Sequence, residues 1–262
     1  KYEEKKEKVM KVSVCGKGGS GKSTIVALLA RELVTRGKEV LIVDADESNY
    51  GLHRHLGMDN PDDFMEYVGG KMGFVQNMGS TQEERTNFMN RYFKEDWGLS
   101  DIPPMYFTEK NGIKLMCSGK IREINEGCAC PFHAVLKAFI MNLKLTDNQV
   151  AILDMEAGIE HFGRGIDDDM DLIFMVCDPS YESLQLADKI TKLADHIQKP
   201  VYYILNKIDD TTELIIKKAI EKKQNIICGI PANRQLLEES LSGEEISLKV
   251  PEINKVADIV TE

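Results

Sequence analysis

Long hydrophobic runs are missing from this sequence: no apolar stretch approaches the roughly 18 residues that a membrane-spanning helix needs. A secretory signal is missing too, because the first residues, KYEEKKEKVMK, mix both signs of charge and contain no apolar core. Repeats and low-complexity segments are absent, and 42% hydrophobic with 29% charged residues is ordinary globular composition. We therefore expect a cytoplasmic protein with no membrane partner.

An excess of basic residues is also missing. The chain carries 33 Lys and Arg against 43 Asp and Glu, which gives a net charge of −10 at pH 7. Non-specific binding of nucleic acids depends on the neutralisation of phosphates by Lys and Arg. The charge balance therefore predicts no nucleic-acid partner.

Strand-like runs rich in aliphatic and β-branched residues alternate with helical patterns along most of the chain. The strand-like runs lie at 8–15, 38–44, 113–119, 149–155, 171–177, 201–207 and 225–230. The helical patterns lie at roughly 22–36, 131–143, 181–197, 211–223 and 251–260. Nearly continuous apolar strands that alternate with helices indicate a mostly parallel sheet with helices on both faces. We predict an α/β fold in which residues 1–262 form a single domain.

Residues 57–112 break this alternation. The segment is rich in Gly, Asn, Asp and Pro and contains the only Trp of the chain, Trp97. Long connections of this kind are often lids or partner-binding segments. The other interpretation is a surface elaboration in which Trp97 serves as a packing anchor. In either case we expect 57–112 to be an elaborated insertion between strands.

A glycine-rich loop stands between the first strand and the first helix, in VSVCGKGGSGKST. Residues 16–23 fit the phosphate-binding pattern G-x-x-x-x-G-K-[ST] at every fixed position. Amide groups of such a loop and the positive end of the following helix bind phosphates. Lys22 is expected to contact the β and γ phosphates, and the Ser23 hydroxyl to coordinate Mg²⁺. The predicted nucleotide-binding residues of this loop are Gly16, Lys17, Gly18, Gly19, Ser20, Gly21, Lys22, Ser23 and Thr24.

A second lysine, Lys17, lies inside the loop, in GKGGSGKS. The pattern resembles the deviant Walker A signature of the MinD/ParA class of ATPases, in which this lysine crosses a dimer interface to the nucleotide of the other subunit. The resemblance implies a P-loop NTPase of the deviant Walker A type that works as a homodimer. A cation supplied across an interface can stabilise the charge of phosphoryl transfer, as an arginine finger does. The other interpretation of Lys17 is a solvated loop lysine.

Three aspartates follow apolar strands: Asp44 and Asp46 in LIVDADESN, and Asp154 in AILDM. Ligands of open α/β sheets bind at the carboxyl ends of strands. By resemblance to the MinD/ParA class, Asp46 positions the attacking water, Asp44 lies near the magnesium ion, and Asp154 corresponds to a Walker B carboxylate. The predicted catalytic residues are therefore Lys17, Lys22 and Asp46. The predicted Mg²⁺ residues, directly or through water, are Ser23, Asp44 and Asp154.

The base-binding residues are expected near the last two strands. Asn206 ends the strand in YYILNKIDD, at the position from which the resembling ATPases contact adenine. The same segment also resembles the N-K-x-D element that selects guanine in GTPases. Because the deviant lysine is present, we favour ATP over GTP. Pro231 and Ala232, in GIPANRQ, are weaker candidates for the base pocket.

Six cysteines lie at 15, 117, 128, 130, 177 and 228. Four of them belong to apolar, strand-like stretches, where a reduced thiol packs as a small hydrophobic group. Cys128 and Cys130 differ, because the C-x-C pair follows NEG and precedes Pro131, a sequence typical of a turn. We predict that residues 126–134 form a metal-binding segment. Two exposed structural thiols are the alternative.

Much of the chain resembles the CooC-type maturation factors of carbon monoxide dehydrogenase, ATPases implicated in nickel insertion. The resembling stretches are CGKGGSGKST, LIVDADESN, LMCSGKI leading into GCACP, AILDMEAGIEHFGRG and DPSYESLQLA. In that family the C-x-C pair is the metal-binding element at the dimer interface. The resemblance implies a metallochaperone for carbon monoxide dehydrogenase, or for acetyl-CoA synthase, whose maturation factor is closely similar.

The ligand count fits a shared metal site. Two thiolates leave a tetrahedral or square-planar ion half coordinated, and a two-fold axis nearby would supply the other two. The expected cofactors are ATP or ADP, Mg²⁺ and Ni²⁺, although thiolates also bind Zn²⁺. Two other functions stay open: a MinD/ParA-like localisation or partition switch, and an iron–sulfur scaffold ATPase.

Overall fold

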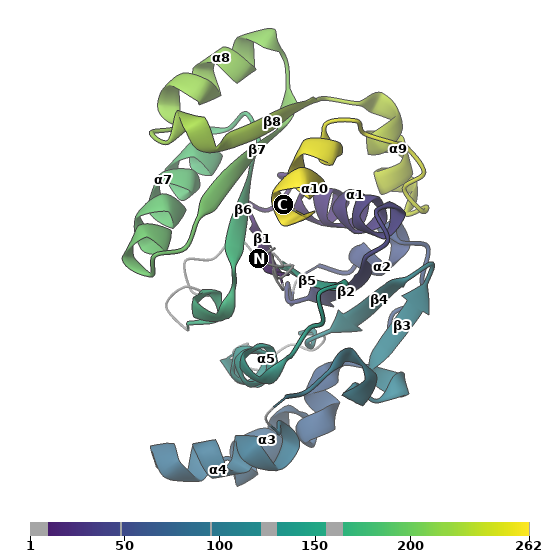
Figure 1. The fold of residues 1–262 in the computed structure, drawn as a ribbon, viewed down its shortest axis with the longest axis vertical. Helices are drawn as coiled ribbons and strands as arrows, with labels where there is room; N and C mark the ends of the chain where they lie inside the picture. The colour runs from purple at the N-terminus through teal and green to yellow at the C-terminus, as the bar shows by residue number, and fades with distance from the viewer. Residues whose placement is uncertain (1–9, 48, 95, 122–129, 156–164, 262) are drawn as a thin grey trace, which may run out of the picture.

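The structure is a computed structural model that describes residues 10–47, 49–94, 96–121, 130–155 and 165–261. Within these residues, eight strands form one sheet in the order β3-β4-β2-β5-β1-β6-β7-β8 (Figure 1). The strands are β1 (Met10–Cys15), β2 (Glu39–Asp44), β3 (Phe107–Lys110), β4 (Ile113–Cys117), β5 (Gln149–Asp154), β6 (Leu172–Cys177), β7 (Val201–Ile208) and β8 (Ile226–Pro231). Neighbouring strands are parallel, except that edge strand β3 is antiparallel to β4.

Helices cover both faces of the sheet (Figure 1). They are α1 (Lys22–Thr35), α2 (Leu52–His55), α3 (Gly70–Asn77), α4 (Gln82–Tyr92), α5 (Cys130–Asn142), α7 (Tyr181–His196), α8 (Asp210–Ala219), α9 (Arg234–Ser242) and α10 (Ile253–Thr261). The apolar side chains of α1 and α10 pack into one core, and those of α5, α7 and α8 pack into the other. The predicted α/β fold with a mostly parallel, doubly covered sheet is confirmed.

Strand side chains alternate between these two cores, as the pleat of a β-strand requires. In β2, Leu41 and Val43 belong to the core that contains α5, whereas Val40 and Ile42 belong to the core that contains α1. All four side chains are buried. A strand that is buried on both faces has to be apolar at every position, which explains the continuous apolar runs of the sequence.

Several elements differ from the sequence prediction, among them helix α9, strand β3 and helix α8. Helix α9 and strand β3 were not predicted, because β3 is a short edge strand inside the insertion and the described side chains of α9 include none that is buried. Helix α8 begins after Asp209, whose side chain accepts hydrogen bonds from Thr211 N and Thr212 N. It ends at Ala219 rather than at 223, because Ile220 is extended and buried in the core.

The insertion at 57–112 contains α3, α4, β3 and three short 3₁₀ helices. Trp97 anchors it in an aromatic cluster, where its ring centroid lies 5.7 Å from those of both Phe93 and Phe139 and 6.2 Å from that of Phe64. The side chain is only 7% exposed. Because Phe139 belongs to α5, this cluster joins the insertion to the helix that begins at Cys130.

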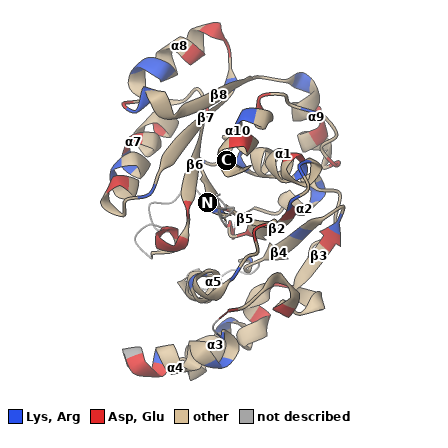
Figure 2. Cartoon of the chain, in the orientation of Figure 1, with Lys and Arg blue, Asp and Glu red and all other residues tan. Residues whose placement is uncertain are grey.

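Among the described residues, no helix combines the length and the apolar character that crossing a membrane would require. Acidic and basic side chains are interspersed on α7 and α8 (Figure 2). Several of them are paired within the same helix, as in Lys192 with Asp188 and Lys217 with Glu213.

Candidate functional site

Glycines shape the loop that joins β1 to α1. Gly21 has a φ of 96°, in the left-handed region that other residues rarely adopt. A Cβ on Gly16 would lie 2.6 Å from the carbonyl oxygen of Val176, so a larger residue would not fit. Helix α1 begins directly after the loop, at Lys22, and places the positive end of its dipole there. The loop therefore has the conformation and the charge of an anion-binding site.

Two side chains from β7 hold this loop. Asn206 Nδ2 donates a hydrogen bond to Ser20 O at 2.7 Å, and Lys207 Nζ donates one to Gly19 O at 2.7 Å. Asn206 is 4% exposed. The described contact of Asn206 is thus with the loop backbone, and its contact with a base stays a prediction.

A cavity of about 790 Å³ opens beside the loop, a size suited to a small-molecule ligand. Ten predicted residues line it: Gly18, Gly19, Gly21, Lys22, Ser23, Thr24, Asp46, Asn206, Pro231 and Ala232. The described lining does not include Gly16, Lys17 or Ser20. Sequence reasoning missed Asn49, His55, Lys207 and the α9 residues Leu236, Leu237 and Ser240. The only signal for α9 was its position directly after the last strand, where ligands of such sheets bind.

Ser23 and Asp154 form the centre of a candidate magnesium site. The Ser23 hydroxyl donates to Asp154 Oδ2 at 2.6 Å, and Asn49 Nδ2 donates to the same Ser23 oxygen at 2.6 Å. Asp154 is completely buried, and its other oxygen, Oδ1, has no hydrogen-bond partner. Burial raises the pKa of Asp154 to about 6, although the nearby Lys22 acts in the opposite direction. A buried carboxylate oxygen without a partner, beside a serine hydroxyl, fits a hard divalent cation such as Mg²⁺.

Two lysines of the loop face different carboxylates. Lys22 Nζ lies 3.7 Å from Asp46 Oδ2, and both side chains are buried. Lys17 Nζ lies 3.5 Å from Asp178 Oδ2, and the Lys17 side chain is 33% exposed. Lys22 therefore belongs to the interior of the site, whereas Lys17 lies at its edge.

Asp44 contacts a lysine that the sequence analysis did not identify. Lys120 Nζ lies 2.7 Å from Asp44 Oδ2 and donates a hydrogen bond at 2.5 Å to the carbonyl oxygen of Asp46. Lys120 is 2% exposed. Burial lowers the pKa of Lys120, but the neighbouring negative groups, Asp44 first among them, together outweigh burial, so the pKa is raised overall. The role of Asp44 near a magnesium ion stays a prediction, because one of its oxygens is already used by Lys120.

The cysteines separate into buried and exposed thiols. Cys130 is exposed at the first residue of α5, whereas Cys128 lies outside the described residues. The remaining cysteines, Cys15, Cys117, Cys177 and Cys228, are buried, as predicted. Burial raises the pKa of Cys117, Cys177 and Cys228 to about 12, which makes these thiols poor metal ligands. Within the described part of the chain, no cluster of three or more metal-ligating side chains is present.

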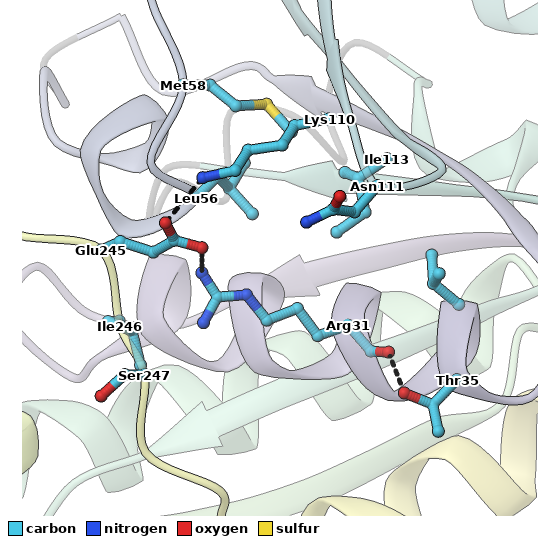
Figure 3. A pocket seen from close by; sticks show the side chains of 11 residues that line it. Arg31, Thr35, Leu56, Met58, Lys110, Asn111, Ile113, Glu245, Ile246 and Ser247 are labelled. Carbon is cyan, nitrogen blue, oxygen red and sulfur yellow. Dashed lines mark hydrogen bonds and ion pairs between the residues drawn. The ribbon is translucent and has the colours of Figure 1, made fainter.

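A second cavity, of about 350 Å³, lies between α1 and the segment after α9 (Figure 3). Glu245 joins its two walls, with Oε1 3.0 Å from Arg31 Nη2 and Oε2 2.6 Å from Lys110 Nζ. Arg31 Nη2 also donates to the carbonyl oxygen of His55 at 2.8 Å, and His55 lines the first cavity. Arg31 therefore connects Glu245 to a residue of the wall of the larger cavity, and the charge of Lys110 is paired with Glu245.

Sequence comparisons identify relatives over most of the chain. The profile of the CobQ/CobB/MinD/ParA nucleotide binding domain matches residues 12–246. The uncharacterized ATP-binding protein MJ0084 of Methanocaldococcus jannaschii is 44% identical over 252 residues, which cover 96% of this chain and 100% of that protein. The carbon monoxide dehydrogenase accessory protein CooC of Rhodospirillum rubrum is 35% identical over 203 residues, 76% of this chain and 74% of that protein.

Solved structures agree on the fold. The septum site-determining protein MinD of Pyrococcus horikoshii OT3, complexed with Mg-ADP, aligns with a TM-score of 0.65 and 16% identity, over 97% of each chain. A plasmid partition protein of Borrelia burgdorferi B31 bound to AMPPNP aligns with a TM-score of 0.59 and 13% identity, also over 97% of each chain. With the phosphate loop, the cavity and the buried acidic site in place, the chain belongs to the CobQ/CobB/MinD/ParA family of nucleotide-binding proteins.

Proposed function

We propose that this protein is an ATP-hydrolysing metallochaperone, a homodimer that delivers nickel to carbon monoxide dehydrogenase or acetyl-CoA synthase. Its nucleotide site supports the ATPase activity. The exposed Cys130 and the 35% identity to the accessory protein CooC support the role in metal delivery.

The pairing of Lys22 with Asp46 at 3.7 Å is the observation that carries the proposed hydrolysis. A nucleotide in the loop offers Lys22 the β and γ phosphates, which carry more negative charge than one carboxylate. Lys22 then binds these phosphates, and the Asp46 carboxylate turns to the attacking water, which it orients and from which it accepts a proton.

Mg²⁺ would be held by Ser23 and Asp154, with Asp44 acting directly or through water, and would neutralise charge on the phosphates. The Ser23 hydroxyl is already aligned for this role by its hydrogen bonds to Asp154 and Asn49. A pre-aligned ligand needs little reorganisation when the cation arrives.

Adenine would lie near Asn206, Pro231 and Ala232, which line the same cavity. The Asn206 amide nitrogen is bonded to the loop, so its side-chain oxygen is the group left for the exocyclic amine of adenine. We propose ATP rather than GTP because the loop carries the deviant lysine, Lys17.

The proposed dimer is closed by ATP. Lys17 is paired with Asp178 at the edge of the site, at 3.5 Å. This partly exposed pair is weak enough to exchange for the phosphate of a second subunit. Lys17 would then act on the nucleotide across the interface.

Nickel is the proposed cargo, bound by Cys128 and Cys130 of two subunits as one four-thiolate site. Cys130 is an exposed thiol at the N-terminus of α5, where the helix dipole favours the thiolate that binds metal. Zn²⁺ is an alternative ion for the same ligands.

Equilibrium dialysis against Ni²⁺ in the presence of Mg·AMPPNP tests the proposal. The unmodified protein should bind one ion per two chains, and Cys130→Ser should lose this ion while Mg·AMPPNP binding is retained. Cys228→Ala is the matched control, because it removes a buried thiol. One tightly bound ion per chain, or full retention in Cys130→Ser, contradicts the shared site. ATP hydrolysis without any metal binding would instead favour a localisation or partition switch, for which the solved structures supply only a likeness of fold.

A further inference from the structure

The end of β2 and the turn after it, here called the 44–50 loop and described at residues 44–47, 49 and 50, touch both the phosphate site and the residues that follow β4. On the nucleotide side, Asp46 Oδ2 lies 3.7 Å from Lys22 Nζ, and Asn49 Nδ2 donates to Ser23 Oγ at 2.6 Å. Both of these contacts have to rearrange when a nucleotide with its cation binds Lys22 and Ser23. The loop is therefore placed to respond to the nucleotide.

The other side of the loop holds the residues that follow β4. Lys120 Nζ lies 2.7 Å from Asp44 Oδ2 and 2.5 Å from the carbonyl oxygen of Asp46. The hydroxyl of Tyr50 donates to the carbonyl oxygen of Ile121, and the Tyr50 ring lies 5.8 Å from the Lys120 ammonium. Lys120 and Ile121 are thus both bonded to the 44–50 loop, through Asp44, Asp46 and Tyr50.

The first turn of α5 lies against the same loop. Glu47 Oε2 lies 3.8 Å from Nε2 of His133, which is buried. The neighbouring Phe132 packs against Gly119 so closely that a Cβ at 119 would lie 2.7 Å from its ring. Cys130 begins this turn. The residues just before position 122 therefore contact the 44–50 loop. The first turn of α5 contacts the same loop through His133 and packs on Gly119 through Phe132.

Burial ties the position of Lys120 to that of Asp44. The residue is 2% exposed, and a protein in which a buried charge loses its counter-charge is strongly destabilised. Lys120 has to follow any movement of Asp44 and the Asp46 carbonyl. Because Gly119 and Ile121 flank it in sequence, such a movement also displaces the contacts of Phe132 and Tyr50.

We infer that the loop at 44–50 transmits the nucleotide state to Cys130, with Lys120 as the positioning residue that couples them. This inference rests on the proposed function, since it supplies the regulation of the proposed metal site. Asp46 then makes two contacts: its carboxylate pairs with Lys22, and its carbonyl oxygen accepts a hydrogen bond from Lys120.

The rate of alkylation of Cys130 by iodoacetamide, measured by peptide mass spectrometry, tests this coupling. In the unmodified protein the rate should change at least about fivefold between the nucleotide-free and the Mg·AMPPNP-bound states, the lower end of typical coupling. Lys120→Met should bring this ratio to about one. Tyr50→Phe removes one exposed hydroxyl, folds without strain, and should lower the ratio about twofold or more.

Matched controls separate coupling from stability. Lys114→Met removes another ion-paired lysine on β4, and Tyr181→Phe removes another exposed hydroxyl; both should keep the full ratio. The inference is overturned if the ratio of alkylation rates is unchanged in both Lys120→Met and Tyr50→Phe. It is also overturned if Mg·AMPPNP does not change the alkylation rate of Cys130 in the unmodified protein. Alkylation needs no metal, so this test is independent of nickel binding. If the protein binds nucleotide and shows the coupling but takes up no nickel, the result supports this inference and contradicts the proposed cargo.

Discussion

The hydroxyl of Ser23 donates a hydrogen bond to Asp154 Oδ2 at 2.6 Å, although the two residues are 131 positions apart in the chain. Ser23 is the second residue of α1 and Asp154 ends β5, so the contact joins the phosphate loop to the central strands of the sheet. Asp154 Oδ1 has no hydrogen-bond partner, which leaves an acceptor for a cation.

Asp154→Asn should therefore weaken the Mg²⁺ dependence of nucleotide binding, because the amide has the size of the carboxylate without its charge. We expect Mg²⁺ affinity in the nucleotide complex to fall at least about tenfold. Titration of ATP affinity against Mg²⁺ measures the effect. Asp258→Asn, which alters a carboxylate paired with Arg36 away from the loop, should leave the Mg²⁺ dependence unchanged.

Asp46→Asn should bind Mg·ATP and hydrolyse it slowly. The amide cannot accept a proton from water, so turnover should fall about 10²–10⁴-fold, while ATP affinity changes little. Lys22→Ala, in contrast, should lose ATP binding, because it removes the cation that meets the phosphates. Single-turnover phosphate release at saturating ATP distinguishes the two variants. Hydrolysis by Asp46→Asn at the unmodified rate would show that another group orients the water.

Lys17→Ala should impair turnover and ATP-driven dimerisation more than it impairs the ATP affinity of one subunit. The reason is the position of Lys17 at the edge of the site, where it pairs with Asp178. Mixing Lys17→Ala with Lys22→Ala chains gives hybrids that keep one intact composite site if Lys17 acts across the interface. Phosphate release by confirmed hybrids is the measurement, and their complete inactivity would count against the role in trans. Lys192→Ala, on the outside of α7, is the control.

Asp167→Asn should stabilise the protein near neutral pH. Burial raises the pKa of Asp167 from its usual 3.8 to about 6, because the charged form loses hydration while one oxygen has no hydrogen-bond partner. The folded state then holds the proton more tightly than the unfolded state, so the penalty is absent below the unfolded pKa, grows as the pH rises, and is complete above about 6.

The free energy of unfolding of Asp167→Asn should exceed that of the unmodified protein by roughly 1–3 kcal/mol at pH 7.5, and the gain should vanish near pH 4. Urea unfolding at the two pH values measures it. The exposed neighbour provides a control, since Asp168→Asn should show no such pH-dependent gain. A gain of equal size at both pH values would assign the effect to packing rather than to charge.

Trp97→Ala should destabilise the insertion and the adjacent α5. The ring is 7% exposed and packs against Phe64, Phe93 and Phe139, so its removal leaves a cavity that costs about 3–5 kcal/mol of the free energy of unfolding. Chemical unfolding followed by circular dichroism reports the loss. Tyr181→Ala, which truncates a side chain that is 72% exposed, should change stability by less than about 0.5 kcal/mol.

Local sequence determined most of the strands of this sheet and the location of its phosphate loop. The parallel strands were visible because burial on both faces requires an apolar residue at every position, as in β6. The sequence predicted the loop through its glycines. Gly16 and Gly21 occupy positions where a side chain would clash or strain the backbone, so the fold requires glycine there. The carboxyl ends of β2 and β5 placed Asp44, Asp46 and Asp154 at one edge of the sheet.

Only the tertiary structure showed what these side chains contact. Lys120 and Asp44 are 76 residues apart, and no local pattern distinguishes a lysine that points into the core from one that points into water. Asn49 reaches Ser23 for the same reason, through the return of the chain after β2. Helix α9 was missed because helix prediction rests on an apolar face buried in a core, whereas none of its described side chains is buried and Leu236 and Leu237 line the ligand cavity. Spacing along the chain therefore located the phosphate loop and its neighbouring carboxylates, and the packing of distant segments decided which side chains touch them.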